Sequence, residues 1–201
     1  MKVIVIGGGH AGIEAAFAAA RMGADAILLT MNLETIAQMS CNPSIGGIAK
    51  GHLVREIDAL GGVMARAADA TGIHFKVLNR SKGPAVRATR TQNDKAAYRL
   101  HLKDFLENIP RFGICQGMAA EIMVRNGRAC GVRLAEGEVL EADAVVISSG
   151  TFLGGRIFIG SASYAAGRAN EPPSLQLAEN IRALGFEVLR LKTGTPMRLH
   201  A

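Results

Sequence analysis

The feature that most constrains the fold is a glycine cluster that follows an apolar run near the first residue. Residues 3–6 read Val-Ile-Val-Ile, and Gly7, Gly9 and Gly12 follow at the spacing G-x-G-x-x-G. After a strand and before a helix, this spacing is typical of a dinucleotide site: the glycines permit a tight turn, a close approach of the pyrophosphate and packing of helix on strand. We predict a strand over 3–6, a helix over 10–22 and a phosphate at the helix N-terminus. A glycine-rich turn without a ligand is the alternative.

A second parallel strand is predicted over 24–30, which completes a βαβ unit. Many dinucleotide folds place Asp or Glu at the end of this strand to bind the ribose hydroxyls. Here the strand ends Leu-Leu-Thr30-Met-Asn32. Thr30 and Asn32 offer weaker hydrogen bonds than a carboxylate does. This end of the strand therefore argues against a generic nicotinamide dehydrogenase.

Length and composition indicate a globular α/β protein. The 201 residues suffice for one substantial domain, alone or with an incomplete second one. Glycines, His10 and Glu14 interrupt the most apolar region, residues 3–20, so neither a membrane span nor a signal peptide is predicted. An odd number of cysteines at spacings without a metal-site pattern favours a reducing compartment, and we expect a cytoplasmic protein with no metal site.

The net charge of +6 is concentrated in one segment, residues 76–103. Its basic residues are Lys76, Arg80, Lys82, Arg87, Arg90, Lys95, Arg99 and Lys103, against Asp94 alone. Such a segment binds the phosphates of a cofactor or of a nucleic acid, or else forms a solvated helix face. Within it, residues 79–87 read as a loop in which Ser81, Lys82 and Gly83 suit contact with a phosphate or a planar ring.

A second loop, predicted over 38–47, carries Cys41 at its centre. Asn42-Pro43 and Gly46-Gly47 are turn formers, and a helix over 49–60 follows. A thiol near a helix N-terminus and near Lys50 is a candidate for a reactive thiolate. A small buried apolar side chain is the alternative for Cys41, and also the favoured interpretation of Cys115 and Cys130.

The rest of the chain supplies the other elements of a flavin-binding domain. Helices are predicted over 64–70, 91–108 and 175–184, the last with Ser174 as N-cap, and strands over 73–78, 112–116, 119–125, 129–134, 139–140 and 143–150. The strands from 112 to 140 are interpreted as a small β-meander with a hairpin at Asn126-Gly127. The last strand ends at Gly150, a second place where backbone can approach a dinucleotide. We predict an α/β, Rossmann-like FAD-binding domain of the glutathione-reductase type, with a parallel sheet plus a β-meander.

Five motifs resemble the GidA (MnmG) family of flavoproteins, which modify the wobble uridine of tRNA. They are Gly7–Gly12, Met39–Pro43, Ser81–Arg90, Gly150–Leu153 and Leu191–Pro196, in this order. The resemblance implies that FAD is bound by Gly7, Gly8, Gly9, His10, Ala11, Gly12, Ala119 and Ser174. It also implies that Cys41 is catalytic and that Arg80, Lys82, Arg87 and Arg90 face FAD or tRNA.

The resemblance further implies the reaction. With a GTPase partner, MnmE, the family uses NADH and methylenetetrahydrofolate to build an aminomethyl or carboxymethylaminomethyl group on C5 of the uridine, and it forms homodimers. Family members are longer, so residues 1–201 are expected to be the N-terminal portion of the FAD-binding domain, with 151–201 starting the linker toward absent insertion and C-terminal domains. The alternatives are a truncated paralogue that binds FAD or RNA without turnover, and a related folate- and FAD-dependent tRNA methyltransferase.

Overall fold

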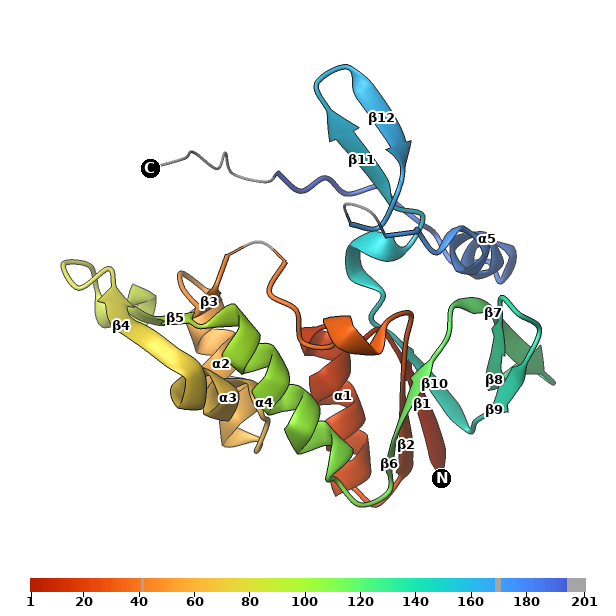
Figure 1. The fold of residues 1–201 in the computed structure, drawn as a ribbon, viewed down its shortest axis with the longest axis horizontal. Coiled ribbons are helices and arrows are strands. Elements are labelled where there is room, and N and C mark those ends of the chain that lie inside the picture. The colour runs from red at the N-terminus through yellow and green to blue at the C-terminus, as the bar shows by residue number, and fades with distance from the viewer. Residues whose placement is uncertain (41, 169–170, 195–201) are drawn as a thin grey trace.

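The computed structural model describes residues 1–40, 42–168 and 171–194, and its centre is a four-stranded parallel sheet (Figure 1). The strand order is β10 (Ala144–Ile147), β1 (Lys2–Ile6), β2 (Asp25–Thr30) and β6 (Phe112–Gln116). Helix α1 (His10–Arg21) connects β1 to β2 in the predicted βαβ unit. The predicted α/β fold with a parallel sheet is confirmed.

The two faces of β1 belong to two different cores, because successive strand residues point to opposite sides. Val3 and Val5 pack with Ile13 of α1 in one cluster, whereas Ile4 and Ile6 pack in the other. The first cluster also takes Tyr98 and Leu102 of α4, and the second takes Val132 and Leu177 from the meander side. Each fully buried side chain of this size contributes about 1.5–3 kcal/mol.

A small antiparallel sheet adjoins the helices, with the order β3 (Ser44–Gly46), β5 (Ala88–Asn93), β4 (Gly72–Leu78). Helices α2 (Lys50–Ala59) and α3 (Met64–Thr71) lie between β3 and β4 in the chain. Two predictions are corrected here. The segment 38–47 contains the short strand β3, and α4 covers Lys95–Glu107 because residues 91–93 pair in β5. Asp94 caps α4 by accepting the N–H groups of Ala96 and Ala97.

The β-meander consists of β7 (Ala119–Arg125), β8 (Arg128–Leu134) and β9 (Val139–Glu141). Residues 112–116 do not belong to it, since β6 pairs in parallel with β2. Helix α5 (Leu175–Ala183) lies beside β7, and the Oδ1 atom of Asn180 accepts the N–H of Ile122 at 2.9 Å.

Residues 150–194 extend above the carboxyl ends of the parallel strands (Figure 1). A hairpin of β11 (Arg156–Ile159) and β12 (Ala162–Ala165) projects from this segment. This hairpin was not predicted from the sequence. Among the described residues, we find no helix with both the length and the apolar character needed to cross a membrane.

Candidate cofactor site

A cleft of about 730 Å³ opens at the carboxyl ends of the parallel strands. In open parallel sheets, ligands bind outside this edge. The floor of the cleft is formed by residues 6–10 and by Ser148–Gly150. Its walls come from the ends of β2 and β3, from α2, and from Phe152, Arg168, Glu171 and Ser174. The cleft therefore gathers segments from most of the described chain.

Two glycines of the β1–α1 turn are required by close packing. Gly7 has φ = 115°, and a Cβ atom there would lie 2.5 Å from the carbonyl oxygen of Ser148. A Cβ atom on Gly12 would lie 1.8 Å from the carbonyl oxygen of Gly7. The Oγ atom of Ser148 donates to the Ile6 carbonyl at 2.8 Å and thereby ties β10 to the turn. These contacts fix the path of the backbone into α1.

Gly9 differs from both, because a Cβ atom there would meet no protein atom within 4 Å. Gly9 lines the cleft and is the N-cap of α1, with no side chain to cap the helix. The first hydrogen bond of the helix runs from Ile13 N–H to Gly9 O at 3.0 Å. The N–H groups of residues 10–12 precede this bond, so they form the exposed positive end of the helix. Ala11 and Gly12 provide backbone at this end, although the cleft wall itself stops at His10.

His10 also contributes a side chain to the cleft wall. Its ring lies edge-to-face on Tyr98 with centroids 5.6 Å apart, and its buried Nδ1 atom has no hydrogen-bond partner. Burial lowers the pKa of His10 from the ordinary 6.5, which favours the neutral imidazole. The Tyr98 hydroxyl is likewise buried without a partner, and burial raises its pKa. The Nδ1 atom of His10 is therefore a buried polar atom that lacks a protein partner beside the uncapped start of α1.

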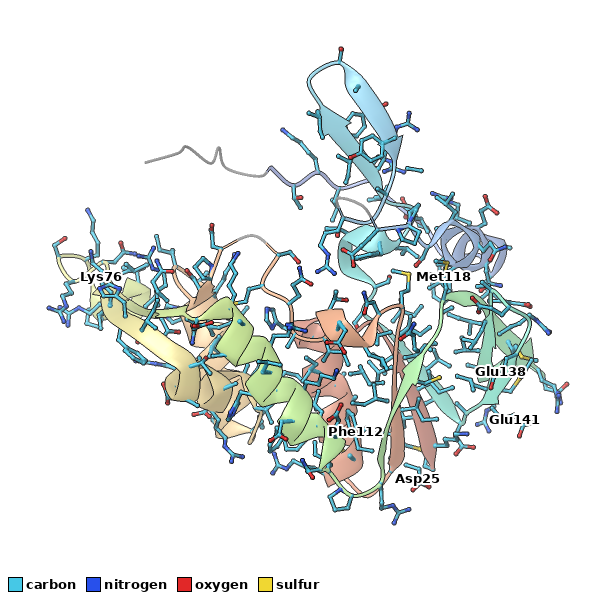
Figure 2. The ribbon with its side chains drawn as sticks, in the orientation of Figure 1. Asp25, Lys76, Phe112, Met118, Glu138 and Glu141 are labelled. Atoms are coloured by element: carbon cyan, nitrogen blue, oxygen red, sulfur yellow. The ribbon has the colours of Figure 1, made fainter. Side chains whose placement is uncertain are left out.

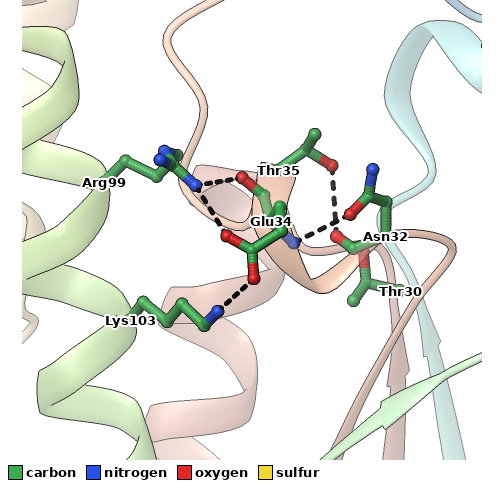
Figure 3. Close-up of polar contacts among 6 residues, drawn as sticks. All are labelled: Thr30, Asn32, Glu34, Thr35, Arg99 and Lys103. Atoms are coloured by element: carbon green, nitrogen blue, oxygen red, sulfur yellow. Dashed lines mark hydrogen bonds and ion pairs between the residues drawn. The ribbon is translucent and has the colours of Figure 1, made fainter.

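At the end of β2, the groups expected to meet a ribose are partly engaged with each other (Figure 3). Asn32 Oδ1 accepts the N–H of Glu34 at 2.8 Å, and Thr30 Oγ1 donates to the Asn32 carbonyl at 3.4 Å. Glu34, the nearest carboxylate, pairs with Arg99 and Lys103 of α4 instead of lining the cleft. Thr30 and Asn32 do line it, so the hydroxyl and amide groups named from the sequence are in place.

Ala119 and Ser174 lie on the wall of the same cleft, although they are far from residues 7–12 in sequence. Ala119 begins β7, so it presents backbone at the edge of the meander. Ser174 occupies the N-cap position of α5, as predicted, but its side chain makes no capping bond. Its N–H donates to the Phe152 carbonyl at 2.8 Å, and its Oγ lies 4.0 Å from the sulfur of Met31.

The four basic candidates are divided by the structure. Arg90 lines the cleft, and its buried Nε atom has no hydrogen-bond partner. Arg80, Lys82 and Arg87 are exposed in the connection between β4 and β5, outside the cleft wall. Lys76 marks this end of the molecule in Figure 2, whereas Glu138 and Glu141 mark the opposite end. The sequence alone could not distinguish Arg90 from the other three.

Cys41 lies outside the described residues, so its predicted role stays a prediction. Its neighbours Ser40 and Asn42 both line the cleft. Two charged residues of the cleft wall, Arg168 and Glu171, were not predicted from the sequence. The only sequence signal for them was an arginine in a glycine-containing segment. Within the described ranges, no three His, Cys, Asp or Glu residues are grouped to hold a metal ion.

Comparison with known proteins gives two kinds of match. Residues 2–201 match the model of the family described as GIDA, glucose inhibited division protein A. Among solved structures, GidA of Aquifex aeolicus in its form I crystal is 52% identical with a TM-score of 0.93, and the match covers 97% of this chain and 32% of that one. The chain thus spans about a third of the length of this relative.

More distant structures share the fold. A GidA-related protein from Thermus thermophilus is 26% identical with a TM-score of 0.66, over 92% of this chain and 68% of that one. PqsL of Pseudomonas aeruginosa, a probable FAD-dependent monooxygenase, is 17% identical with a TM-score of 0.58, over 96% of this chain and 48% of that one. The second likeness shows the fold alone. The match to the family model along nearly the whole sequence shows that the chain belongs to the GidA family.

Proposed function

We propose that this chain binds FAD and forms the flavin-binding part of an enzyme that modifies the wobble uridine of tRNA. The observation that carries the proposal is the uncapped N-terminus of α1, which faces a large cleft at Gly9, where a Cβ atom would meet no protein atom. Helix N-termini of this kind bind phosphate through backbone N–H groups and the helix dipole. Membership of the GidA family agrees with a flavin as the ligand.

The residues on the cleft wall fit an extended dinucleotide. Gly7, Gly8, Gly9, His10, Ala11 and Gly12 would hold the pyrophosphate, and Ala119 would contact the adenine side through its backbone. Ser174 would add a contact on the wall that also contains Phe152. When bound, the flavin supplies hydride and electron transfer. The part played by these residues is to bind and orient it.

The complete reaction requires groups beyond this chain, which spans about a third of the relative's length. We infer that the whole protein uses NADH and methylenetetrahydrofolate, acts as a homodimer with an MnmE-like GTPase in the cytoplasm, and adds an aminomethyl or carboxymethylaminomethyl group to C5 of the uridine. Cys41 is proposed to act on the pyrimidine ring. Residues 151–201 would begin the connection to the remaining domains.

The exposed basic residues support tRNA as the substrate. Arg80, Lys82 and Arg87 offer three cations at one end of the molecule, where they are free to meet a phosphate backbone. Arg90 lines the cleft, so we infer that it contacts the cofactor and not the tRNA. The match to the GIDA family model and the 52% identity with GidA of Aquifex aeolicus support uridine modification of the GidA type.

The test of the cofactor proposal is flavin retention. The chain is mixed with FAD, excess FAD is removed, and the absorbance spectrum is recorded beside that of a Gly9→Glu variant. We expect bound flavin in the unmodified chain and its loss in the variant, because a carboxylate would repel the pyrophosphate.

Gly83→Glu is the matched control, since Gly83 also has open space at its Cβ position but lies outside the cleft. This variant should retain flavin. Equal retention by the Gly9→Glu variant would contradict the proposal.

A further inference from the structure

One hydrogen bond joins two walls of the cleft that come from distant parts of the chain. Arg168 Nη1 donates to Ser40 Oγ at 2.8 Å, across 128 residues of sequence. Ser40 follows the short helix Leu33–Thr35, and Arg168 lies between β12 and α5. Both residues line the cleft. The bond therefore joins two segments of the cleft wall that are distant in sequence.

The side chain of Arg168 is also fixed by contacts other than its hydrogen bond to Ser40. Its Nε and Nη2 atoms donate to the two carboxylate oxygens of Glu171, the second at 2.7 Å. The backbones of the same two residues are also hydrogen-bonded, with the Glu171 N–H donating to the Arg168 carbonyl at 3.0 Å. The guanidinium group also lies 5.3 Å from the ring centroid of Phe152. Because these contacts already fix the guanidinium group, Arg168 loses little conformational freedom when its Nη1 atom donates to Ser40.

The surroundings of this ion pair distinguish it from an ordinary surface pair. The side chains of Arg168 and Glu171 are only 22% and 23% exposed, whereas the Arg111–Asp25 pair is 58% and 57% exposed. Partial burial strengthens charge-assisted hydrogen bonds by reducing solvent screening. Arg168 can therefore hold Ser40 at a defined place in the cleft wall.

We propose that Arg168 is a positioning residue that holds two segments of the cleft wall together around the bound cofactor and slows its release. This inference rests on the proposed FAD site. Because the hydrogen bond between Arg168 and Ser40 fixes these two segments relative to each other, its loss leaves the wall less ordered around a bound ligand. A wall that is ordered before FAD binds loses less conformational freedom on binding, so loss of the bond weakens binding, chiefly through faster dissociation. The sites proposed for the pyrophosphate lie elsewhere, in residues 7–12.

The experiment measures FAD association and dissociation by stopped-flow flavin fluorescence in Arg168→Ala, Ser40→Ala and the double variant. We expect Arg168→Ala to raise the dissociation rate about tenfold, as the loss of a charge-assisted hydrogen bond implies. The association rate should stay within about twofold, since affinity changes of this kind fall mostly on dissociation. Ser40→Ala should change the rate in the same direction, and the double variant should equal Arg168→Ala. Ser40→Thr, which keeps a hydroxyl, should restore slow release.

The chain offers a matched control. Arg156 donates to Ser163 Oγ at 2.8 Å in the β11–β12 hairpin, outside the cleft wall. Arg156→Ala removes the same kind of bond and should leave both FAD rates unchanged. The melting temperature of each flavin-free variant is measured in parallel. If Arg168→Ala does not fold, the comparison of Ser40→Ala with Ser40→Thr carries the test.

The outcomes separate the two proposals. Wild-type chain that binds FAD while Arg168→Ala and Ser40→Ala release it at the wild-type rate would overturn the positioning role alone. Equal acceleration by Arg156→Ala, or additive effects in the double variant, would overturn it as well. Wild-type chain that binds no FAD would overturn the proposed cofactor function and this inference with it.

Discussion

The glycine turn at residues 7–12 and the hairpin connection at residues 79–87 both offer groups that bind anions, but with different atoms. The turn offers backbone N–H groups at the start of α1, in a position fixed by the contacts of Gly7 and Gly12. The connection offers Arg80, Lys82 and Arg87 as exposed side chains. The first arrangement fixes one anion in one place, whereas the second attracts a charged surface over a distance.

The two regions therefore suit two different ligands, a resident cofactor and a nucleic acid. Backbone donors on a packed turn cost little reorganisation when a ligand binds, so they suit a resident cofactor. Side-chain cations on an exposed connection release counterions when they meet nucleic acid, so their contribution depends strongly on salt. The two regions should therefore respond to different substitutions and different solution conditions.

The largest expected effect comes from the packed half of the turn. Gly12→Ala places a Cβ atom against the Gly7 carbonyl, and we expect the free energy of unfolding to fall by about 3 kcal/mol through overpacking. Gly9→Ala, which meets open space, should lower it by less than about 1 kcal/mol. Urea unfolding of the flavin-free variants measures both. Equal losses would show that the turn is not packed as described.

Removing the exposed cations should weaken RNA binding without affecting flavin binding. The triple variant carries Arg80→Ala, Lys82→Ala and Arg87→Ala. The slope of the logarithm of the association constant for tRNA against the logarithm of the salt concentration should become less steep by about 2 to 3, close to one unit for each lost phosphate contact. Filter binding of tRNA at several salt concentrations measures this slope.

The control removes two exposed arginines from the opposite end, Arg125→Ala and Arg128→Ala in the β7–β8 hairpin. RNA binding should not change in this control. An equal decrease in slope would mean that the charge of the whole protein, and not the hairpin connection, attracts RNA.

A pH effect is expected from His10 within the turn. Burial lowers its pKa below 6.5 in the folded chain, so the unfolded chain binds more protons as the pH falls through this value. The free energy of unfolding should therefore be highest above about pH 6.5, and it should decrease as the pH falls toward the lower pKa of His10 in the folded chain. Urea unfolding at a series of pH values measures this, and His10→Gln should flatten the decrease that begins below about pH 6.5. An unchanged profile in that variant would assign the effect to other groups.

The smallest effect is expected at Glu34, the carboxylate nearest to the end of β2. Its pKa is lowered chiefly by the hydrogen bond from Lys103, but the side chain is well exposed to solvent. Glu34→Gln should leave FAD affinity unchanged and lower the melting temperature slightly, by an amount that high salt abolishes. Calorimetry with and without salt measures the shift. A marked loss of FAD affinity would place this carboxylate in the site after all.

Local sequence signals predicted the elements of the cleft floor well. The apolar run and glycine spacing located β1 and α1 within a residue or two, because each residue there meets a local requirement for strand, turn or helix. The boundary of α4 was wrong by four residues. Residues 91–93 pair in β5, and Asn93 is held by a bond from its Nδ2 atom to the Ala68 carbonyl. Asp94 as N-cap was the local signal that marked the true start.

Long-range pairings were beyond the sequence. Residues 112–116 are next to the meander in the chain, yet they pair with β2, whose register depends on contacts far away. The β11–β12 hairpin lacks a buried face, so it shows no clear alternation of apolar and polar residues. Arg168 and Glu171 line the cleft beside Ser40, which lies 128 residues from Arg168 in the sequence.

Hydrogen exchange measured by mass spectrometry, with and without FAD, tests the contrast between the two regions most directly. The amides of residues 10–12 lie outside the internal hydrogen bonds of α1, so bound FAD should slow their exchange, while residues 79–87 should exchange at the same rate in both samples. Protection of residues 79–87 with no change in residues 10–12 would contradict the account, because it would place the cofactor on the basic connection and not on the glycine turn.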